Sequence, residues 1–269
     1  MNILYAIILG VIQGATEFLP VSSSGHLVLA ESFLGVHEAS LTFDVVLHLG
    51  TLVAVIIYFR RDFWLMAKAL LAWRDKSPET ASLRVLALQL AAATLPAVLA
   101  ALLFGDAIEA NLRQPWVVAV TLAGVGLLLL LGEKTGKHQR HFSSITWLDT
   151  MLIGFAQALA IIPGVSRSGI TMTAGLFRDL NRQAVARFSF LLSAPIILGA
   201  GVYKIPEIIH QGLTPGQGNF YLAGFVSSAV SGYLVIAFLL HFIRTRTFEV
   251  FAYYRFILAA LVCLSLLLH

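Results

Sequence analysis

The chain has 269 residues, of which 58% are hydrophobic and only 12% charged, with a formal net charge of +4 and a mean hydropathy of +0.86. Soluble domains carry about 25% charged residues, so this composition excludes a soluble enzyme, a disordered chain and a secreted disulfide scaffold. The apolar runs contain proline and glycine without a two-residue alternation, which predicts an all-α integral membrane protein rather than an outer-membrane barrel. The basic residues flank apolar segments, where membrane proteins concentrate them, so we expect no nucleic-acid partner.

Six uninterrupted apolar stretches are long enough to cross a membrane, which takes about 20 helical residues. In chain order they are roughly residues 43–59, 85–104, 115–132, 188–205, 220–242 and 248–268. Two further stretches, 3–34 and 147–178, are each interrupted in the middle by proline, serine and glycine, and we expect them to be broken helices. The amphipathic stretch 62–76 is predicted to be a helix on the membrane surface.

Lysine and arginine gather in four segments between the apolar stretches. These are Arg60, Arg61, Lys68, Arg74, Lys76 and Arg84 in the first, Lys134, Lys137 and Arg140 in the second, Arg178, Arg182 and Arg187 in the third, and Arg244, Arg246 and Arg255 in the fourth. If these four loops are cytoplasmic, the six spans alternate consistently, and the stretch 147–178 begins and ends on the cytoplasmic side. It is then a re-entrant hairpin, and the stretch 3–34 is a hairpin that enters from the opposite face.

The two halves of the chain resemble each other at an offset of 144 residues. The matching pairs are Gly10 and Gly154, Gln13 and Gln157, Val21 and Val165, Ser22 and Ser166, Ser24 and Ser168, and Gly25 and Gly169. We therefore expect one membrane domain, residues 1–269, that contains two repeats, 1–132 and 147–269. Each repeat has one re-entrant hairpin and three spans, so the repeats are inverted relative to each other, as in many transporters.

The two breaks predict a polar cavity, because irregular backbone at membrane depth is tolerated only where it is buried in protein or lines such a cavity. The half-helices that restart at about His26 and Ile170 would direct N–H groups and serine hydroxyls at one point. Arg167 adds a guanidinium suited to phosphate oxygens. These features indicate an anion site, most naturally for phosphate. Two simple kinks are the alternative, but they leave Arg167 unexplained.

Glu17 lies one turn before Pro20 in an otherwise apolar helix, and Gln13 lies one turn earlier on the same face. A carboxylate at bilayer depth is costly and is therefore a functional candidate. Three roles are open to Glu17: pairing with Arg167, holding a divalent cation, or acting as an acid or base.

The remaining polar candidates near the breaks are less decisive. His26 follows the serine turn and can supply a base, an acid or a nucleophile. Asp44 and His48 are four residues apart and form a supporting pair, a cation ligand or only a local hydrogen-bonded pair. Thr171 can donate to a phosphate or back to its own helix.

Two long motifs resemble the signatures of the undecaprenyl-pyrophosphate phosphatase family, the bacitracin-resistance membrane proteins. They are QGATEFLPVSSSGH at residues 13–26 and PGVSRSGIT at residues 163–171, and the resemblance extends over the whole chain. It implies hydrolysis of undecaprenyl pyrophosphate to undecaprenyl phosphate and inorganic phosphate, which recycles the lipid carrier for cell-wall synthesis. It also implies a multi-pass protein of the bacterial cytoplasmic membrane with its site facing the periplasm, a divalent cation (Mg²⁺ or Ca²⁺) and a homodimer.

Taken together, the residues and the resemblance predict a catalytic set and a substrate-binding set. The catalytic residues expected are Glu17, Ser23, His26 and Arg167, with Glu17 also the metal ligand, and the substrate-binding residues expected are Gln13, Ser22, Ser24, Gly25, Gly164, Ser166, Ser168 and Thr171. Many family members have glutamate where this chain has Gln13, which leaves Glu17 as the main anionic candidate. Whether Ser23, His26 or a water molecule is the nucleophile stays open. The rival function is a transporter or flippase of an anionic prenyl-phosphate lipid.

Overall fold

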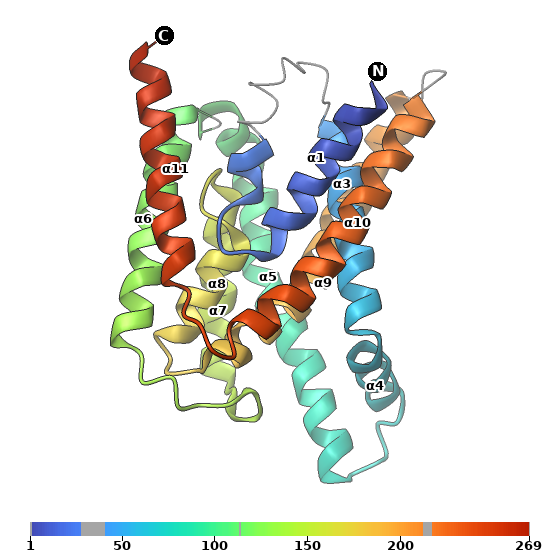
Figure 1. The fold of residues 1–269 in the computed structure, drawn as a ribbon. Coiled ribbons are helices and arrows are strands. Elements are labelled where there is room, and N and C mark those ends of the chain that lie inside the picture. Colours follow the sequence, from blue (N-terminus) through green and yellow to red (C-terminus); the bar gives the residue numbers. More distant parts are fainter. Residues whose placement is uncertain (1, 28–40, 113, 212–216, 269) are drawn as a thin grey trace.

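The structure is a computed structural model that describes residues 2–27, 41–112, 114–211 and 217–268. The helices are α1 (Ile3–Phe18), α3 (Leu41–Tyr58), α4 (Arg60–Leu71), α5 (Pro78–Leu112), α6 (Pro115–Thr135), α7 (Trp147–Ala158), α8 (Arg167–Leu176), α9 (Arg182–Gln211), α10 (Gln217–Phe242) and α11 (Glu249–Leu268), with short 3-10 turns η1 (Phe142–Ser144) and η2 (Leu159–Ile161). The long helices stand side by side as a bundle, with the two chain ends at the same end of it (Figure 1).

Within the described residues, five helices are long and apolar enough to cross a membrane. Their apolar segments are Pro78–Ile108, Pro115–Thr135, Arg182–Lys204, Gly218–Phe242 and Glu249–Leu267, at the positions of five predicted spans. The predicted span 43–59 coincides with α3, which qualifies only together with α4, and the two helices are bent by 77° at their junction. The expected surface helix at 62–76 is α4, which begins two residues earlier and ends at Leu71.

The outer surface of the bundle is apolar. Large side chains along the spans are exposed, among them Leu103 at 72% and Ile257 at 62%, whereas Phe18, Phe188 and Leu129 are buried between helices. Contiguous apolar surface of this kind marks contact with lipid rather than with water. The exposed faces therefore agree with the five apolar spans.

Helix α10 packs closely on α1 and α3 through small residues. A Cβ added to Gly10 would lie 2.5 Å from the carbonyl oxygen of Gly224, and one added to Gly50 would lie 2.5 Å from the carbonyl oxygen of Phe225. Such contacts let backbones approach where lipid leaves no hydrophobic force between helices. They fix α1, and with it the start of the first hairpin, against the bundle.

The two broken helices enter the bundle from opposite ends. In Figure 1, α1 runs inward from the end that holds the chain termini and turns back at mid-height, while α7 and α8 enter from the other end. The described part of the first hairpin ends at residue 27, so the predicted segment 28–34 lies outside the described residues. The helices restart at residue 23 and at Arg167, three residues before the expected positions, because Ser22 and Ser166 cap them.

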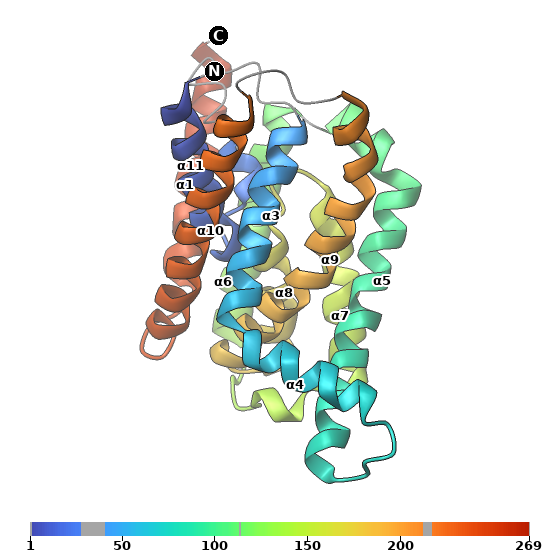
Figure 2. The same ribbon diagram turned by 90° about the vertical axis from the view of Figure 1, so that its right-hand side faces the viewer.

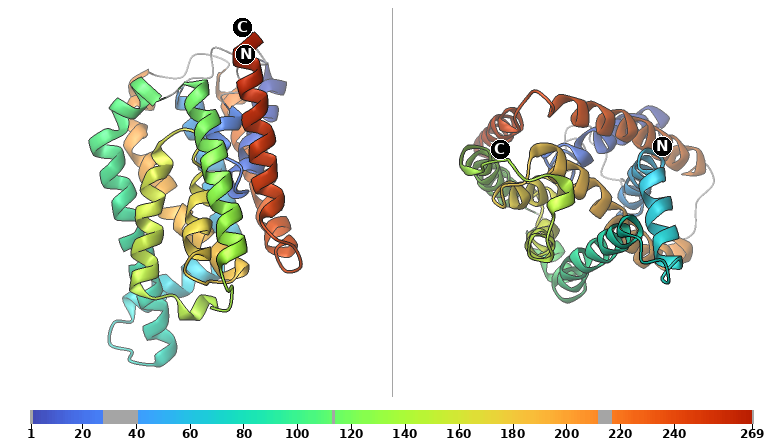
Figure 3. Two further views of the ribbon diagram at one scale, coloured as in Figure 1. Left: turned by 90° about the vertical axis from the view of Figure 1, so that its left-hand side faces the viewer. Right: turned by 90° about the horizontal axis from the view of Figure 1, so that it is seen from below.

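The loops that carry most of the basic residues lie at the end of the bundle opposite the termini. Helix α4 and the connections after α6 and α10 all lie there (Figures 2 and 3). Asp149, buried at the start of α7, accepts hydrogen bonds from Arg140 at 2.5 Å and from Arg178 at 2.8 Å, which fastens the second hairpin at this end. Arg255 was expected in the same loops, and that prediction is wrong: it lies inside α11 and is fully buried.

Replacing Gly10 with alanine should lower the thermal unfolding midpoint of the purified protein in detergent. The new Cβ would meet the backbone of Gly224, which cannot rotate away, and overpacking of this kind costs about 1–3 kcal/mol. Gly124→Ala is the matched control, because nothing lies within 4 Å of its added Cβ and alanine favours a helix. Equal midpoints for the two variants would contradict the close packing of α1 on α10.

Candidate functional site

The two breaks have the same local geometry at equivalent positions of the two halves. Ser22 has a φ of 76° and Ser166 a φ of 70°, a conformation that non-glycine residues adopt rarely and that concentrates at functional sites. The Ser22 hydroxyl accepts the N–H of Gly25 at 3.3 Å, and the Ser166 hydroxyl accepts the N–H of Gly169 at 3.1 Å. The strained serines thus act as N-caps of the restarting helices.

Each break is also held by side chains from elsewhere in the chain. The Ser168 hydroxyl donates to the carbonyl oxygen of Leu19 at 2.9 Å, and the Thr121 hydroxyl donates to that of Pro163 at 2.7 Å. The N–H of Gly164 donates to the Ser24 hydroxyl at 3.4 Å. The two breaks therefore meet inside the bundle, each supplying partners for the other.

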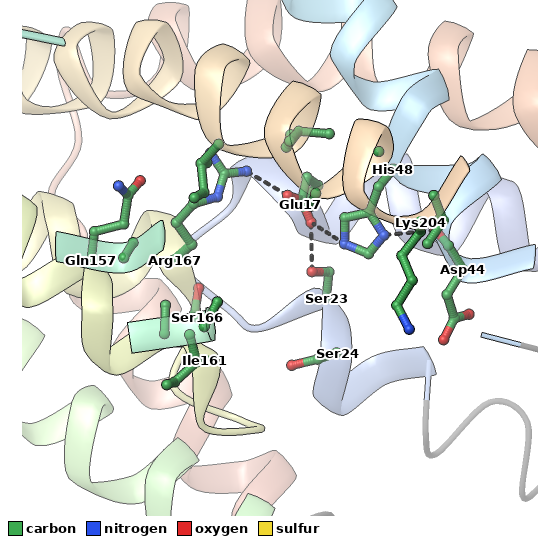
Figure 4. A pocket seen from close by; sticks show the side chains of 18 residues that line it. Glu17, Ser23, Ser24, Asp44, His48, Gln157, Ile161, Ser166, Arg167 and Lys204 are labelled. Atoms are coloured by element: carbon green, nitrogen blue, oxygen red, sulfur yellow. Dashed lines mark hydrogen bonds and ion pairs between the residues drawn. The ribbon is translucent and has the colours of Figure 1, made fainter. Parts of the chain in front are cut away.

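A cavity of about 410 Å³ lies beside the meeting point of the breaks. Its lining comes from α1, the restart after the first break, α3, α5, α7, η2, the start of α8, and α9 (Figure 4). The lining residues are Glu17, Ser23, Ser24, Asp44, Val45, His48, Ala97, Ala101, Gln157, Ala160, Ile161, Ser166, Arg167, Ile196, Ile197, Ala200, Gly201 and Lys204. One wall is thus polar and charged, and most of the others are formed by alanine and isoleucine.

Glu17 is the centre of the polar wall. Its carboxylate is ion-paired with Arg167 and accepts hydrogen bonds from the Ser23 hydroxyl at 2.6 Å and from the Gln13 amide at 3.0 Å. The Nε2 atom of His48 lies 3.6 Å from the carboxylate (Figure 4). With a side chain only 5% exposed, the carboxylate is compensated by its partners rather than by water.

Five predicted site residues line this cavity together: Glu17, Ser23, Ser24, Ser166 and Arg167. The other predicted binding residues lie behind it. Gln13 donates to Glu17, Ser22 and Gly25 form the first N-cap, and Gly164 turns with a φ of 86° against Thr121. Ser168 bonds Leu19, and the Thr171 hydroxyl donates to the carbonyl oxygen of Arg167 and lies 2.8 Å from that of Ser189. These residues shape the breaks rather than the cavity wall.

His26 does not line the cavity. Its Nδ1 atom lies 2.7 Å from the carbonyl oxygen of Ser22, and its Nε2 atom lies 2.6 Å from the hydroxyl of Tyr254 in α11. The ring also stacks on that of Tyr254, with centroids 5.6 Å apart. Both ring nitrogens are therefore engaged by partners other than Glu17.

Four polar residues of the cavity wall were not among the predicted site residues: Asp44, His48, Gln157 and Lys204. The sequence did signal His48 and Asp44 as a pair. The Nδ1 atom of His48 bonds the main-chain carbonyl of Asp44 at 2.7 Å, which leaves Nε2 to face Glu17. Lys204 was one of the few basic residues outside the four basic loops. Gln157 was noted only as the repeat partner of Gln13.

The cavity offers oxygen ligands for a hard cation. Glu17 and Asp44 line the same cavity, and Mg²⁺ is usually bound by one or two carboxylates together with substrate phosphates. Among the described residues, no group of three or more His, Cys, Asp or Glu side chains forms a complete protein cage. A cation in this cavity would therefore need further ligands, such as the oxygens of a bound phosphate.

These observations define a class of protein: a polytopic helical membrane protein with two broken helices around a pocket of arginine, glutamate and serine. The chain belongs to the family described as bacitracin resistance protein BacA, which it matches over residues 6–261. It is 48% identical to the undecaprenyl-diphosphatase of Rubrobacter xylanophilus, over 100% of both chains. It is 46% identical to that of Pelobacter propionicus, over 96% of this chain and 94% of the relative. For that of Geobacter sulfurreducens the identity is 44%, over 95% of each.

Removal of one partner of the Glu17–Arg167 pair should destabilise the protein more than removal of both. Glu17→Gln leaves the guanidinium of Arg167, which is only 14% exposed, without its counter-charge, and loss of one partner of a buried pair costs up to about 3–5 kcal/mol. Glu17→Gln with Arg167→Met leaves no charge there. We expect a lower thermal unfolding midpoint in detergent for the single variant than for the double variant. A midpoint of the double variant equal to or below that of Glu17→Gln would contradict an ion pair between the two side chains.

Proposed function

We propose that this chain is an undecaprenyl-pyrophosphate phosphatase that releases inorganic phosphate and leaves undecaprenyl phosphate, and so confers bacitracin resistance. The observation that carries the proposal is the 2.6 Å hydrogen bond from the Ser23 hydroxyl to Glu17, beside Arg167, in a pocket of a BacA family member. The names of the relatives support the same activity. A hydroxyl bonded to a carboxylate is an activated nucleophile, which a simple carrier does not need.

In this proposal Arg167 binds the terminal phosphate, and Glu17 takes the proton of Ser23 as its oxygen attacks phosphorus. The new bond joins the serine oxygen to phosphorus, and the bond to the bridging oxygen breaks, so undecaprenyl phosphate leaves. Glu17 gives the proton to the leaving undecaprenyl phosphate and is again a carboxylate. It then takes a proton from the water that attacks the phosphoserine and returns it to the serine oxygen, which frees inorganic phosphate. The guanidinium and the N–H groups of the restarting helices stabilise charge on the transferred group.

Ser23 is preferred over His26 as the nucleophile because of their positions. Ser23 lines the cavity and is bonded to Glu17, whereas both ring nitrogens of His26 are engaged by Ser22 and Tyr254. His48 is the histidine beside the carboxylate, at 3.6 Å. We assign His48 the task of holding Glu17 in place and His26 that of holding the serine turn.

A divalent cation, Mg²⁺ or Ca²⁺, is part of the proposal. Asp44 and Glu17 would hold it, with the phosphates of the substrate as further ligands. When bound, the cation neutralises the charge of the leaving phosphate.

The proposed setting is the bacterial cytoplasmic membrane, with six spans, α3 included, and the inverted repeats 1–132 and 147–269. The matching serine geometry of the two breaks supports the repeat. The basic loops are placed in the cytoplasm, so the pocket, whose lining reaches Lys204 near the other end of α9, opens toward the periplasm. The prenyl tail would pass between Ala97, Ala101 and Ala200 into the surrounding lipid.

Phosphate release from undecaprenyl pyrophosphate by the purified protein tests this function. We expect Glu17→Gln to reduce the rate by about 10²–10⁴-fold, the range for a lost general base, and Ser23→Ala to reduce it at least as far. His26→Ala should reduce the rate less than Ser23→Ala does, because its ring holds the serine turn but lies outside the cavity. Ser82→Ala, at an exposed serine of α5, is the matched control and should behave as wild type.

Two outcomes of this assay would overturn parts of the proposal. No phosphate release by folded wild type, with lipid movement in sealed vesicles, would favour the flippase. Loss of activity in His26→Ala but not in Ser23→Ala would show that His26, and not Ser23, is the nucleophile.

Chelation of divalent cations with EDTA should abolish phosphate release, and added Mg²⁺ or Ca²⁺ should restore it. The carboxylate of Asp44 is one of the proposed ligands, so Asp44→Asn should raise the cation concentration needed for half-maximal rate. Unchanged activity in EDTA would show that phosphate release does not need a divalent cation.

A further inference from the structure

Arg255 is a fully buried arginine in the second turn of α11, and the mechanism above does not use it. It does not line the cavity, and among the described residues the hydrogen bonds of its guanidinium go to main-chain carbonyl oxygens. A buried cation in a membrane-spanning helix is costly and marks a functional position. The carbonyl oxygens that it binds indicate the role of this side chain.

The guanidinium reaches both breaks at once. Its Nη1 atom donates to the carbonyl oxygen of Pro20 at 3.2 Å, in the first break. Its Nη2 atom donates to those of Gly164 at 3.0 Å and Val165 at 3.2 Å, in the second break. One side chain from a third part of the chain therefore joins the two interrupted helices.

The same side chain is anchored on α6, beside α11 (Figure 3). Its Nε atom donates to the carbonyl oxygen of Leu122 at 3.0 Å, and Nη2 lies 3.2 Å from that of Thr121. Gly169 leaves room for it, since a Cβ there would lie 3.3 Å from Nη1. The guanidinium is thus held on three sides, which fixes its position relative to the bundle.

The fixed carbonyls are close in sequence to the reacting residues. Pro20 precedes Ser23 by three residues, and Val165 precedes Arg167 by two. Main-chain turns this short leave little freedom between the anchored carbonyl and the side chain that follows. The position of Ser23 relative to Arg167 therefore depends on the guanidinium that ties the two turns together.

We infer that Arg255 is a positioning residue that fixes the two breaks relative to each other, and so holds the nucleophile Ser23 opposite the phosphate-binding Arg167. This inference rests on the proposed function. A guanidinium suits the task because its planar set of five N–H donors spans several carbonyls. Lysine has three donors on one atom and can therefore bind only some of these carbonyl oxygens.

The test compares Arg255→Met, Arg255→Gln and Arg255→Lys with wild type in kcat and KM for phosphate release in detergent. Misplacement of reacting groups by about 1 Å costs about 100-fold in rate, so we expect kcat to fall by about that factor in the Met and Gln variants. KM should stay close to that of wild type, because Arg167 remains to bind phosphate. Arg255→Lys should recover part of the lost kcat.

Arg244→Met and Arg244→Lys are the matched controls, since Arg244 is exposed in the connection after α10. A second readout, hydrogen exchange of residues 19–27 and 163–170, does not depend on activity. Exchange should rise in both segments in the Arg255 variants and in neither segment in the Arg244 variants.

Each result decides the inference. Wild-type kcat in a folded Arg255→Met variant would overturn it, and so would faster exchange at one break alone. If Arg255→Met does not fold, Arg255→Lys decides: a lowered kcat at unchanged KM supports the inference, and a wild-type kcat overturns it. If wild type itself releases no phosphate, the proposed function fails, and the exchange measurement still decides whether Arg255 couples the breaks.

Discussion

A helix that stops inside a membrane leaves carbonyl and N–H groups without partners, and the rest of this structure depends on how those groups are satisfied. The partners here are side chains rather than water alone. Ser168 bonds Leu19, Thr121 bonds Pro163, and Arg255 bonds carbonyls of both breaks. Each interruption is therefore stable only because the other one, together with α6 and α11, is in place. The site residues that follow the two breaks are held in place by these contacts.

The same arrangement explains how a carboxylate can lie in an apolar bundle. Glu17 is compensated by Arg167 from the other half of the chain, and Ser23, Gln13 and His48 surround it. A buried pair of this kind adds little net stability, because the cost of desolvation offsets the attraction. Its value lies in orientation: it holds the guanidinium and the hydroxyl on one side of a cavity with apolar walls.

The sequence predicted the breaks and most spans well, because a run with Pro20 and three serines cannot continue as a helix, and because hydropathy reports length directly. It also predicted that Glu17, Ser23 and Arg167 belong together. It placed His26 and not His48 among the catalytic residues, since the contact of His26 with Tyr254, which is 228 residues away, could not be read from the sequence. Arg255 was assigned to a loop because it was grouped with the nearby Arg244 and Arg246. Its carbonyl partners come from segments far away in the sequence.

The Glu17–Arg167 pair joins residues 150 positions apart, and this separation bears on biosynthesis. A growing chain emerges from its N-terminus, so the segment that carries Glu17 meets the membrane well before the ribosome has made its counter-charge. An uncompensated carboxylate in lipid is unfavourable. Until residue 167 is made, the first hairpin is therefore more stable in a hydrated place, such as the membrane surface, or with the carboxyl of Glu17 protonated. Final burial of the first hairpin with a charged Glu17 is thus a late event, completed only when both halves of the chain are present.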